Sequence, residues 1–267
     1  MVGHDEAGTL ARVLEQALAA AGPADEVWFV DSASTDDSAQ IAAALGVEVV
    51  SAPLGKGRAI ATALERCRGG YLCLGDADLE RSSENIALRL REAAIASDAE
   101  MVVGEVDLPP GRPRTVTPAI YRTLVGALFP EAERLELEKP LSGFRVLRAG
   151  VDVGALPPGF GVETHLNVHL AATGREVARC PVGDYCGRLR GALHVAAVGA
   201  DVAGAILDLA ELHGRIDPSA RRRWDDWAEA VLAVIREQPE EGDYGEFMRR
   251  LDAAAERPLP VRGWHGD

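Results

Sequence analysis

The feature that most constrains the fold is a regular alternation of short apolar runs with longer segments of helical periodicity, which continues to about residue 106. The apolar runs have the length and composition of buried strands. The predicted strands cover residues 26–31, 47–51, 70–75 and 100–106, and the predicted helices cover residues 7–21, 35–45, 56–68 and 83–96. This alternation predicts an α/β protein with right-handed crossovers and a mostly parallel, Rossmann-like sheet flanked by helices.

The rest of the chain is less regular and carries longer connections. Residues 107–118 are rich in proline and glycine and predict a loop, and residues 131–142 predict a charged connector. Further strands are predicted at residues 143–148 and 176–182, and further helices at residues 119–129 and 162–173. We therefore expect three parts: residues 1–106, residues 107–190 as the second half of the same domain, and a helical C-terminal extension over residues 191–267.

The start of the chain is unusual for this class, because it enters the first predicted helix at about residue 7. A sheet of this kind normally opens with a central strand, and at most a stub of strand can precede this helix. One interpretation is that Met1 lies inside the natural reading frame.

The charge balance narrows the choice of partners. The chain has 28 basic and 42 acidic residues, which gives a net charge of −14, and only 5% of its residues are aromatic. Such a chain repels nucleic-acid phosphates and anionic lipid and offers few platforms for base stacking. Its most apolar segment, residues 193–209, is interrupted by two aspartates, so no membrane span is predicted.

The start of the chain lacks the regions of a signal peptide, and the four cysteines lack the spacing of a zinc knuckle. They are also too few for a disulfide scaffold. We therefore expect a cytoplasmic protein with reduced thiols.

The sharpest polar motif is Asp76-Ala77-Asp78, which directly follows a predicted strand. Ligands of open α/β sheets collect at the carboxyl ends of strands, and two such carboxylates can hold a divalent cation that in turn holds a diphosphate. The alternative for Asp76 and Asp78 is a solvated turn that caps the next helix.

Two other strand ends carry polar or glycine-rich sequences. Residues 31–37 read Asp-Ser-Ala-Ser-Thr-Asp-Asp, which suits either the cap of the next helix or contacts with a nucleoside. Residues 55–57 read Gly-Lys-Gly, whose glycines would let a ligand approach the backbone while Lys56 supplies positive charge. The full phosphate-loop motif is absent.

The order of these motifs is more specific than any one of them. His4-Asp5-Glu6, the Asp-Ser-Ala-Ser-Thr-Asp-Asp run, Gly-Lys-Gly and Asp-Ala-Asp follow one another along the chain. In this the sequence resembles nucleotide-sugar glycosyltransferases of the GT-A fold. Residues 139–143 (Lys-Pro-Leu-Ser-Gly) and 158–163 (Pro-Gly-Phe-Gly-Val-Glu) are similar to the acceptor side of the glucosyl-3-phosphoglycerate synthases, and Thr117 falls where that family binds its acceptor.

The resemblance implies roles for individual residues. It implies that the nucleoside-diphosphate sugar is held by Glu6, Asp31, Ser34, Lys56 and Asp76. It implies that Asp78 ligates Mg²⁺ or Mn²⁺, and that Thr117, Gly143 and Arg188 serve the acceptor. Catalytic roles are implied for Asp76, Asp78 and Glu163, the last by orienting the sugar or the acceptor hydroxyl. The alternative for Glu163 is a carboxylate favoured by the dipole at a helix start.

The sequence departs from the family pattern in two places. The family places a metal-binding histidine after its last strand, where this chain reads Asp-Tyr-Cys-Gly-Arg over residues 184–188. The candidates for that ligand are His194, Asp184 and Cys186, of which the oxygen ligand suits magnesium best. The family's Gly-Glu-Tyr also becomes Gly-Phe-Arg from Gly143 onward, which bears on the identity of the acceptor.

The activity implied is transfer of a sugar, glucose in the resembling family, from a donor such as UDP-glucose to a small acceptor such as 3-phosphoglycerate, with retention of configuration.

The alternatives are a GT-A transferase with another sugar and acceptor, a nucleotidyltransferase, and a degenerate nucleotide-sugar-binding protein. A nucleotidyltransferase would open with a glycine-rich basic loop, which this N-terminus lacks. Paired carboxylates repel each other when no cation uses them, which favours the enzyme. The resemblance also suggests a homodimer.

Overall fold

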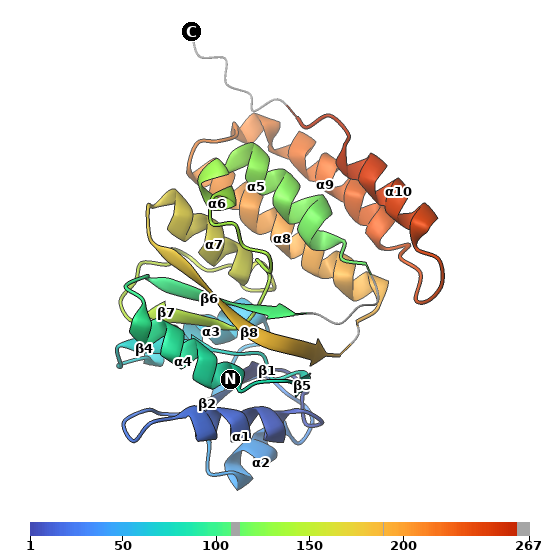
Figure 1. Ribbon diagram of the computed structural model, residues 1–267. Coiled ribbons are helices and arrows are strands. Elements are labelled where there is room, and N and C mark those ends of the chain that lie inside the picture. The colour runs from blue at the N-terminus through green and yellow to red at the C-terminus, as the bar shows by residue number, and fades with distance from the viewer. Residues whose placement is uncertain (108–112, 189, 261–267) are drawn as a thin grey trace. The chain divides into compact units, whose positions relative to one another are not determined.

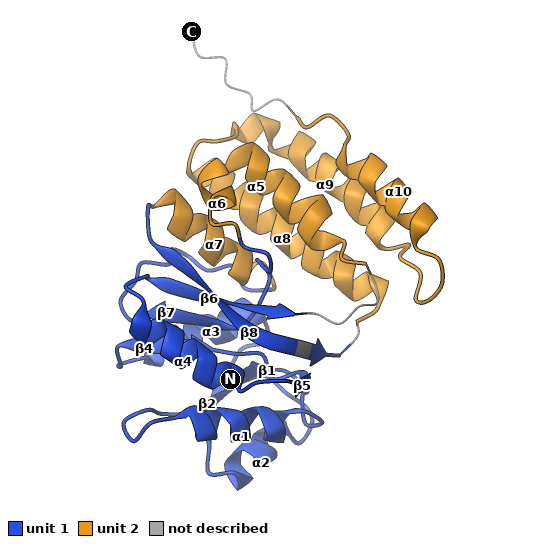
Figure 2. Cartoon of the chain, in the orientation of Figure 1, with its two compact units in different colours: residues 1–109, 137–159, 174–188 blue, residues 110–136, 160–173, 189–267 orange. Residues whose placement is uncertain are grey.

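The computed structural model describes residues 1–107, 113–188 and 190–260, apart from the side chain of residue 185 (Figure 1). The chain forms two compact units, each assembled from three separate stretches of sequence (Figure 2). The first unit comprises residues 1–109, 137–159 and 174–188 and contains the β-sheets, whereas the second comprises residues 110–136, 160–173 and 189–267 and is helical.

The amino-terminal part of the first unit is a parallel three-stranded sheet with helical crossovers. Its strands are β1 (Val2–Gly3), β2 (Trp28–Ser32) and β3 (Glu48–Ala52), in that spatial order. Its helices are α1 (Leu10–Ala20), α2 (Ser38–Ala44) and α3 (Lys56–Arg66). The predicted alternation is confirmed here, and β1 is the short stub that the sequence predicts. Leu10, Val13 and Leu14 are buried because their spacing places them on one face of α1.

The second sheet of this unit has five strands in the order β4-β7-β6-β8-β5. These strands are β4 (Tyr71–Leu74), β5 (Leu79–Ser82), β6 (Met101–Asp107), β7 (Arg145–Arg148) and β8 (Val177–Gly187). β6 and β8 are parallel, whereas β7 runs antiparallel to both of its neighbours. The α/β class is confirmed, and the sheet becomes mixed where β7 enters.

Two details of this sheet differ from the prediction. β5 was not predicted, because its four residues, Leu-Glu-Arg-Ser, lack the apolar alternation that marks a strand. β8 was predicted to end at residue 182 but continues to Gly187, where its polar end pairs antiparallel with β5. This extension carries the end of β8 back to the residues that follow Asp78.

A single residue of β1 links the two sheets. The Val2 N–H donates to the Gly75 carbonyl oxygen at 3.0 Å, and the Ala77 N–H donates to the Val2 carbonyl oxygen at 3.2 Å. Val2 and Asp76 thereby form a parallel bridge, which sets the carboxyl ends of β1, β2 and β4 side by side.

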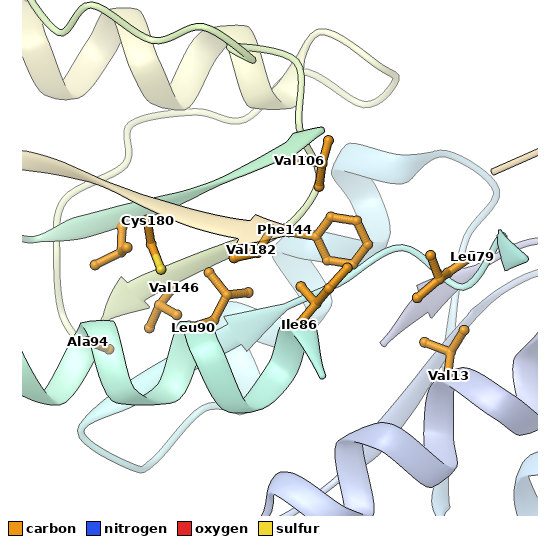
Figure 3. Close-up of a cluster of buried hydrophobic side chains, with 11 residues drawn as sticks. Val13, Leu79, Ile86, Leu90, Ala94, Val106, Phe144, Val146, Cys180 and Val182 are labelled. Atoms are coloured by element: carbon orange, nitrogen blue, oxygen red, sulfur yellow. The ribbon is translucent and has the colours of Figure 1, made fainter. Parts of the chain in front are cut away.

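The main core of this unit packs α4 (Ile86–Ala96) against the five-stranded sheet (Figure 3). Ile86, Leu90 and Ala94 recur at every fourth position of α4 and share one cluster with Val146 and Val182. Burial of one such aliphatic side chain contributes roughly 1.5–3 kcal/mol. A second cluster, around Leu10, Leu14 and Phe29, lies under the three-stranded sheet.

The second unit is a bundle of helices. They are η1 (Thr117–Arg122, a π-helix), α5 (Thr123–Leu128), α6 (Pro130–Glu133), α7 (Val162–Ala172), α8 (Ala192–Leu212), η2 (Pro218–Ala220, a 3-10 helix), α9 (Arg221–Ile235) and α10 (Gly245–Ala255). Trp224 on α9 is one of the largest fully buried side chains. Arg221, at the start of α9, forms ion pairs with Asp208 of α8 and with Asp225 of α9, so the first of these pairs links the two helices.

The helix α8 has the length and the hydropathy of a membrane-spanning segment, although none was predicted from the sequence. Its most apolar window has a mean hydropathy of 1.6, and 44% of that window is buried inside the fold. α8 packs against α7 and α9. Length and composition of this kind also occur in the central helix of a bundle, which is the place that α8 takes in the second unit.

Candidate functional site

The candidate site of the first unit is built on loops that follow β1, β2 and β4. The hydroxyl of Thr9, after β1, donates to the Ala77 carbonyl oxygen at 2.7 Å, and the His4 Nδ1 lies 2.9 Å from the Ser32 carbonyl oxygen at the end of β2. The loops are therefore hydrogen-bonded to one another at the carboxyl edge of the parallel strands. This edge is where open α/β sheets bind their ligands.

The first two loops interlock through reciprocal hydrogen bonds. The Asp5 N–H donates to the Ser34 hydroxyl at 3.0 Å, and the Thr35 N–H donates to the Asp5 carboxylate at 2.6 Å. The Thr35 N–H also holds the pKa of Asp5 below its usual value. Asp5 and Ala33 adopt φ values of +54° and +58°, a region that residues other than glycine rarely enter. Strain of this kind is retained where the surroundings fix the backbone, as at ligand sites.

This interlock also fixes two of the predicted donor residues. The carboxylate of Asp31, at the end of β2, accepts a hydrogen bond from the Ser34 N–H at 3.0 Å. Because Ser34 is held from both sides, by Asp31 and by the N–H of Asp5, the loop has one defined shape. This role of Asp5 was not predicted from the sequence.

Glu6 and Arg188 come together although the resemblance implied that one serves the donor and the other the acceptor. Glu6 is buried, at 5% exposure, and its Oε2 lies 3.5 Å from the Arg188 Nη2. Arg188 directly follows Gly187, which pairs with Leu79 beside Asp78. The extension of β8 therefore brings a cation to the carboxylates of the first unit.

Lys56, Asp76 and Gly143 form the best-defined cluster of the site. The Lys56 Nζ lies 2.7 Å from the Asp76 Oδ1, and both side chains are less than a quarter exposed, at 18% and 22%. A Cβ atom on Gly143 would lie 2.3 Å from both oxygens of Asp76, so the carboxylate rests directly against this glycine. The predicted donor residues Lys56 and Asp76 and the predicted acceptor residue Gly143 thus share one site.

The glycines that flank Lys56 allow a close approach of another part of the chain. A Cβ atom would lie 2.4 Å from the Pro158 carbonyl oxygen at Gly55 and 1.8 Å from the Pro157 carbonyl oxygen at Gly57. The Gly57 N–H donates to the Gly159 carbonyl oxygen at 3.2 Å. Residues 157–159 of the chain itself therefore lie directly against these two glycines and satisfy the first turn of α3.

A buried arginine supports the turn that carries Gly143. Arg145 is only 1% exposed, its Nε donates to the Ser142 carbonyl oxygen at 2.8 Å, and its Nη2 donates to the Pro140 carbonyl oxygen at 2.7 Å. The guanidinium therefore fixes the turn against which Asp76 rests. In the Gly-Phe-Arg segment, which departs from the family pattern, the arginine is thus buried inside the fold. The hydrophobic periodicity of the sequence did not predict this role.

The carboxylates fit a divalent cation that is shared with a phosphate ligand. No cluster of three or more metal-binding side chains occurs among residues 1–107, 113–188 and 190–260. Magnesium, however, is commonly bound by one or two protein carboxylates together with substrate phosphates and water. Asp78, the ligand that the resemblance implies, lies two residues beyond Asp76, which is paired with Lys56. Both are oxygen donors, which is the chemistry that Mg²⁺ and Mn²⁺ prefer.

The three candidates for a further ligand lie in different surroundings. Asp184 is exposed, and its N–H donates to the Ser83 hydroxyl at 3.0 Å. Cys186 pairs with Arg81 in the β5–β8 ladder, so it lies nearer along that ladder to Asp78 than Asp184 does. His194 belongs to the second unit, where its ring contacts Phe160 edge to face with centroids 5.3 Å apart.

The remaining predicted residues, Thr117 and Glu163, also belong to the second unit. Thr117 is half-buried and begins η1. Glu163 is in the first turn of α7 at 3% exposure. Just before α7, the Phe160 N–H donates to the Asp201 carboxylate at 2.7 Å, which ties the start of this helix to α8. Carboxylates are rarely buried this deeply unless they are paired.

Fold and site together define an α/β protein that carries clustered acidic and basic side chains at the carboxyl edge of its parallel strands, the arrangement expected for a nucleotide ligand. The sequence profile of glycosyl transferase family 2 matches residues 1–146. The chain therefore belongs to glycosyl transferase family 2 and is a glycosyltransferase.

Solved structures of similar fold agree with this assignment. The chain is 25% identical to glucosyl-3-phosphoglycerate synthase from Mycobacterium tuberculosis in complex with Mn²⁺, UDP-glucose and phosphoglyceric acid, with a TM-score of 0.67 over 79% of this chain and 78% of that chain. It is 27% identical to a mycobacterial protein, with a TM-score of 0.69 over 78% and 72%. Mannosyl-3-phosphoglycerate synthase from Rubrobacter xylanophilus shares the fold, at 22% identity and a TM-score of 0.72 over 81% and 74%. The comparison with curated proteins gave no match.

We predict that Gly57→Ala destabilises the protein although alanine is the better helix former. The intrinsic preference favours alanine by about 1 kcal/mol, but the added Cβ would meet the backbone oxygen of Pro157 at 1.8 Å. Urea denaturation should show a net loss of about 2–4 kcal/mol in the free energy of unfolding. Gly8→Ala is the control, because nothing lies within 4 Å of its added Cβ. Equal stability of the two variants would contradict the tight contact.

We also predict that Arg145→Met destabilises the turn at residues 139–143. The substitution keeps an apolar stem but leaves the carbonyl oxygens of Pro140 and Ser142 without their buried donor. Thermal or urea unfolding should show a loss of roughly 2–4 kcal/mol. Arg148→Met, at the far end of β7 and 40% exposed at its side chain, should cost less than about 1 kcal/mol. If Arg148→Met lowered the free energy of unfolding by as much as Arg145→Met, the structural role given to Arg145 would be wrong.

Proposed function

We propose that this glycosyltransferase moves glucose from UDP-glucose to 3-phosphoglycerate with the help of Mg²⁺ or Mn²⁺. The observation that carries the proposal is the cluster of Glu6, Lys56, Asp76 and Asp78 at the carboxyl edge of the sheet. The similar mycobacterial enzyme was crystallised with this donor, with Mn²⁺ and with phosphoglyceric acid. The four donor motifs of the sequence fall within the residues that match the family.

In this proposal the interlocked loops select the nucleotide. Asp31 and Ser34 contact the nucleoside, since their backbone is fixed and each can offer a polar atom to a base or a ribose. Glu6 is already buried and gains a hydrogen-bonded partner from the ligand at small further desolvation cost. A prearranged loop loses little entropy when the ligand binds.

The chemical step breaks the bond between the anomeric carbon and the diphosphate oxygen and forms a bond to the acceptor hydroxyl oxygen. When bound at Asp78, the divalent cation supplies positive charge to the leaving diphosphate. Lys56 and Arg188 hold further positive charge at this edge, and Asp76 keeps the Lys56 ammonium in place.

We propose that the reaction retains configuration. Inversion needs a carboxylate base across the sugar from the diphosphate, and the described residues of the first unit offer no clear candidate for it. In the retaining course, the acceptor hydroxyl proton passes to the departing diphosphate on the same face of the sugar. Glu163 then orients the sugar or the acceptor hydroxyl, and Thr117, Gly143 and Arg188 bind the acceptor.

One observation favours a second candidate, a transferase with another acceptor. In the Gly-Phe-Arg segment that departs from the resembling family, Arg145 is buried and bonded to the turn, so it does not offer its charge to an acceptor phosphate. The proposed identity of the sugar donor does not depend on the position of Arg145. The acceptor should therefore be tested separately from the donor.

The cellular compartment and the oligomeric state of the enzyme are also part of the proposal. Cys67, Cys73, Cys180 and Cys186 are free thiols, which suits a reducing compartment such as the cytoplasm. A homodimer is expected from the resemblance. Size-exclusion chromatography with light scattering measures that state directly.

We predict that Asp78→Ala lowers the metal-dependent release of nucleoside diphosphate by at least about a hundredfold, because a ligand of the cation is lost. The assay compares UDP-, GDP- and ADP-sugars with Mg²⁺ or Mn²⁺, with and without 3-phosphoglycerate. Glu80→Ala removes an exposed carboxylate two residues away and should leave the release unchanged.

The outcomes of this assay separate the candidates. Release that 3-phosphoglycerate stimulates and Asp78→Ala abolishes supports the proposal and names the donor. Release that 3-phosphoglycerate does not change supports the other-acceptor candidate. If neither release nor metal-dependent nucleotide binding occurs, the chain is a degenerate member of its family and the proposal is wrong.

For the acceptor we predict that Thr117→Val raises the KM for 3-phosphoglycerate by roughly tenfold, since valine keeps the shape but loses one hydrogen bond to an anionic ligand. The KM for the nucleotide sugar should stay unchanged. Thr123→Val is the matched control, because Thr123 is also half-buried and its hydroxyl donates to the Pro118 carbonyl oxygen. Equal effects on both KM values would contradict an acceptor role for Thr117.

A further inference from the structure

Three histidines of the helical second unit lie beside one another, although the whole chain contains only six. His165 and His169 are about one turn apart on α7, and His213 directly follows α8. The rings of His165 and His169 stack with their centroids 5.4 Å apart and their planes at 8°, and the His213 ring lies 6.4 Å from that of His169. These three residues form the histidine cluster. The proposed function gives none of them a role.

The middle ring of the cluster is deeply buried. His169 is 7% exposed, and neither its Nδ1 nor its Nε2 has a hydrogen-bond partner among the residues that the structure describes. The Nε2 of the half-buried His213 is in the same situation within those residues. A neutral imidazole places one N–H and one lone pair in such surroundings, whereas an imidazolium places two N–H groups and a charge there. Burial therefore favours the neutral rings.

The carboxylates near the cluster are engaged by arginines. Glu131 of α6 attracts a charge on His213, but its Oε1 already lies 2.7 Å from the Arg215 Nη2. Glu211, two residues before His213 on α8, lies 3.5 Å from the Nη1 of Arg221 on α9. A proton on the cluster would therefore have to compete with these guanidinium groups for its counter-charge.

Burial and the neighbouring positive charges disfavour a proton on His213. Desolvation is the largest effect, and His169 and Arg215 add repulsion, so the pKa of His213 is lowered below its usual value despite the attraction of Glu131. The His213 ring also packs edge to face against Phe129, with centroids 6.0 Å apart. The Arg215 guanidinium lies over the same Phe129 ring, 5.7 Å from its centroid. The ring of His213 is thus held between apolar and cationic groups.

The dipole of α7 acts in the opposite direction at His169, because it favours a cation in the last turn of a helix. This attraction is smaller than the cost of burying an imidazolium that has no acceptor for its N–H groups. It also acts on one ring only. A charge on His169 would in turn repel a charge on His213, whose ring is 6.4 Å away.

A histidine that stays neutral in the folded protein makes stability depend on pH. The unfolded chain binds a proton at each histidine with a pKa of about 6.5, whereas a neutral buried ring does not. The unfolded state then binds more protons below that pH. The contribution of such a ring to the free energy of unfolding is therefore complete above about pH 6.5 and is lost as the pH falls below that value.

We propose that the histidine cluster is an acid-sensitive lock of the second unit, which keeps α7 packed against α8 while His169 and His213 are neutral and loosens this packing below about pH 6.5. The same helix α7 carries Glu163 in its first turn. Loosening of α7 would thus also remove the support of that carboxylate. The lock itself does not depend on which sugar or acceptor the enzyme uses.

The test replaces His169 in two ways that both remove the titrating group. His169→Leu fills a similar volume with an apolar side chain, and His169→Gln keeps a neutral polar one. A third variant combines His169→Leu with His213→Leu. The control is His4→Gln, which removes a histidine of the first unit whose side chain is 43% exposed. Thermal unfolding is measured between pH 7.5 and 5.5, together with imidazole NMR and amide exchange of the wild type.

Acidification should lower the Tm of the wild type, and each histidine removed from the cluster should reduce this loss by roughly 3–5 °C. His169→Leu and His169→Gln should agree in this respect, whereas a role in packing alone would shift Tm equally at both pH values. His4→Gln should not reduce the loss. In the folded wild type, the NMR signals of His169 and His213 should remain those of neutral imidazole down to about pH 5.5. Protection of the amides of α7 and α8 should fall at least about tenfold relative to those of α1 and α3.

Three results would overturn the proposal. The first is titration of the His169 and His213 rings near pH 6.5 in the folded protein, which the NMR measurement detects without any variant. The second is an equal loss of Tm on acidification in the wild type and in both His169 variants. The third is a rise in the Tm of the wild type with Zn²⁺ that the His169 variants lack, which would assign the cluster to metal binding instead.

Discussion

The ion pair between Lys56 and Asp76 is the interaction on which the candidate site depends. Its 2.7 Å contact joins the start of α3 to the end of β4, and Gly143 closes the third side because a side chain there would collide with the carboxylate. Both partners are partly buried, so solvent and salt weaken the attraction less than at a fully exposed pair. Three stretches of chain that are distant in sequence thereby meet at one carboxylate.

The surroundings of this pair explain why backbone contacts matter as much as charges. Gly55 and Gly57 allow residues 157–159 to lie against the start of α3, and Arg145 holds the carbonyl groups of the turn before β7. Each is a packing constraint that fixes where Lys56 or Asp76 can lie. The positions of the charged groups thus follow from tight backbone packing, which tolerates little change in volume.

The sequence could predict most of the α/β alternation, because buried strands and amphipathic helices leave strong periodic signals, as Leu10, Val13 and Leu14 do in α1. It could not predict β5 or the end of β8, since these polar segments become strands through pairing with each other. The motifs of the site were found by their order along the chain. The link between Glu6 and Arg188 and the role of Arg145 depend on tertiary contacts, for which a single sequence carries no signal.

The short β1 strand aligns the loops of the candidate site. At its carboxyl end, Val2 bridges to Asp76 and so aligns the loops that carry the donor residues. Val2 and Gly3 also pair with Val30 and Asp31 of β2, so β1 holds the ends of β2 and β4 in register. The order of the donor loops therefore depends on a strand of two residues, and Gly3 is needed in it because an added Cβ would lie 2.8 Å from the Cβ of Ala77.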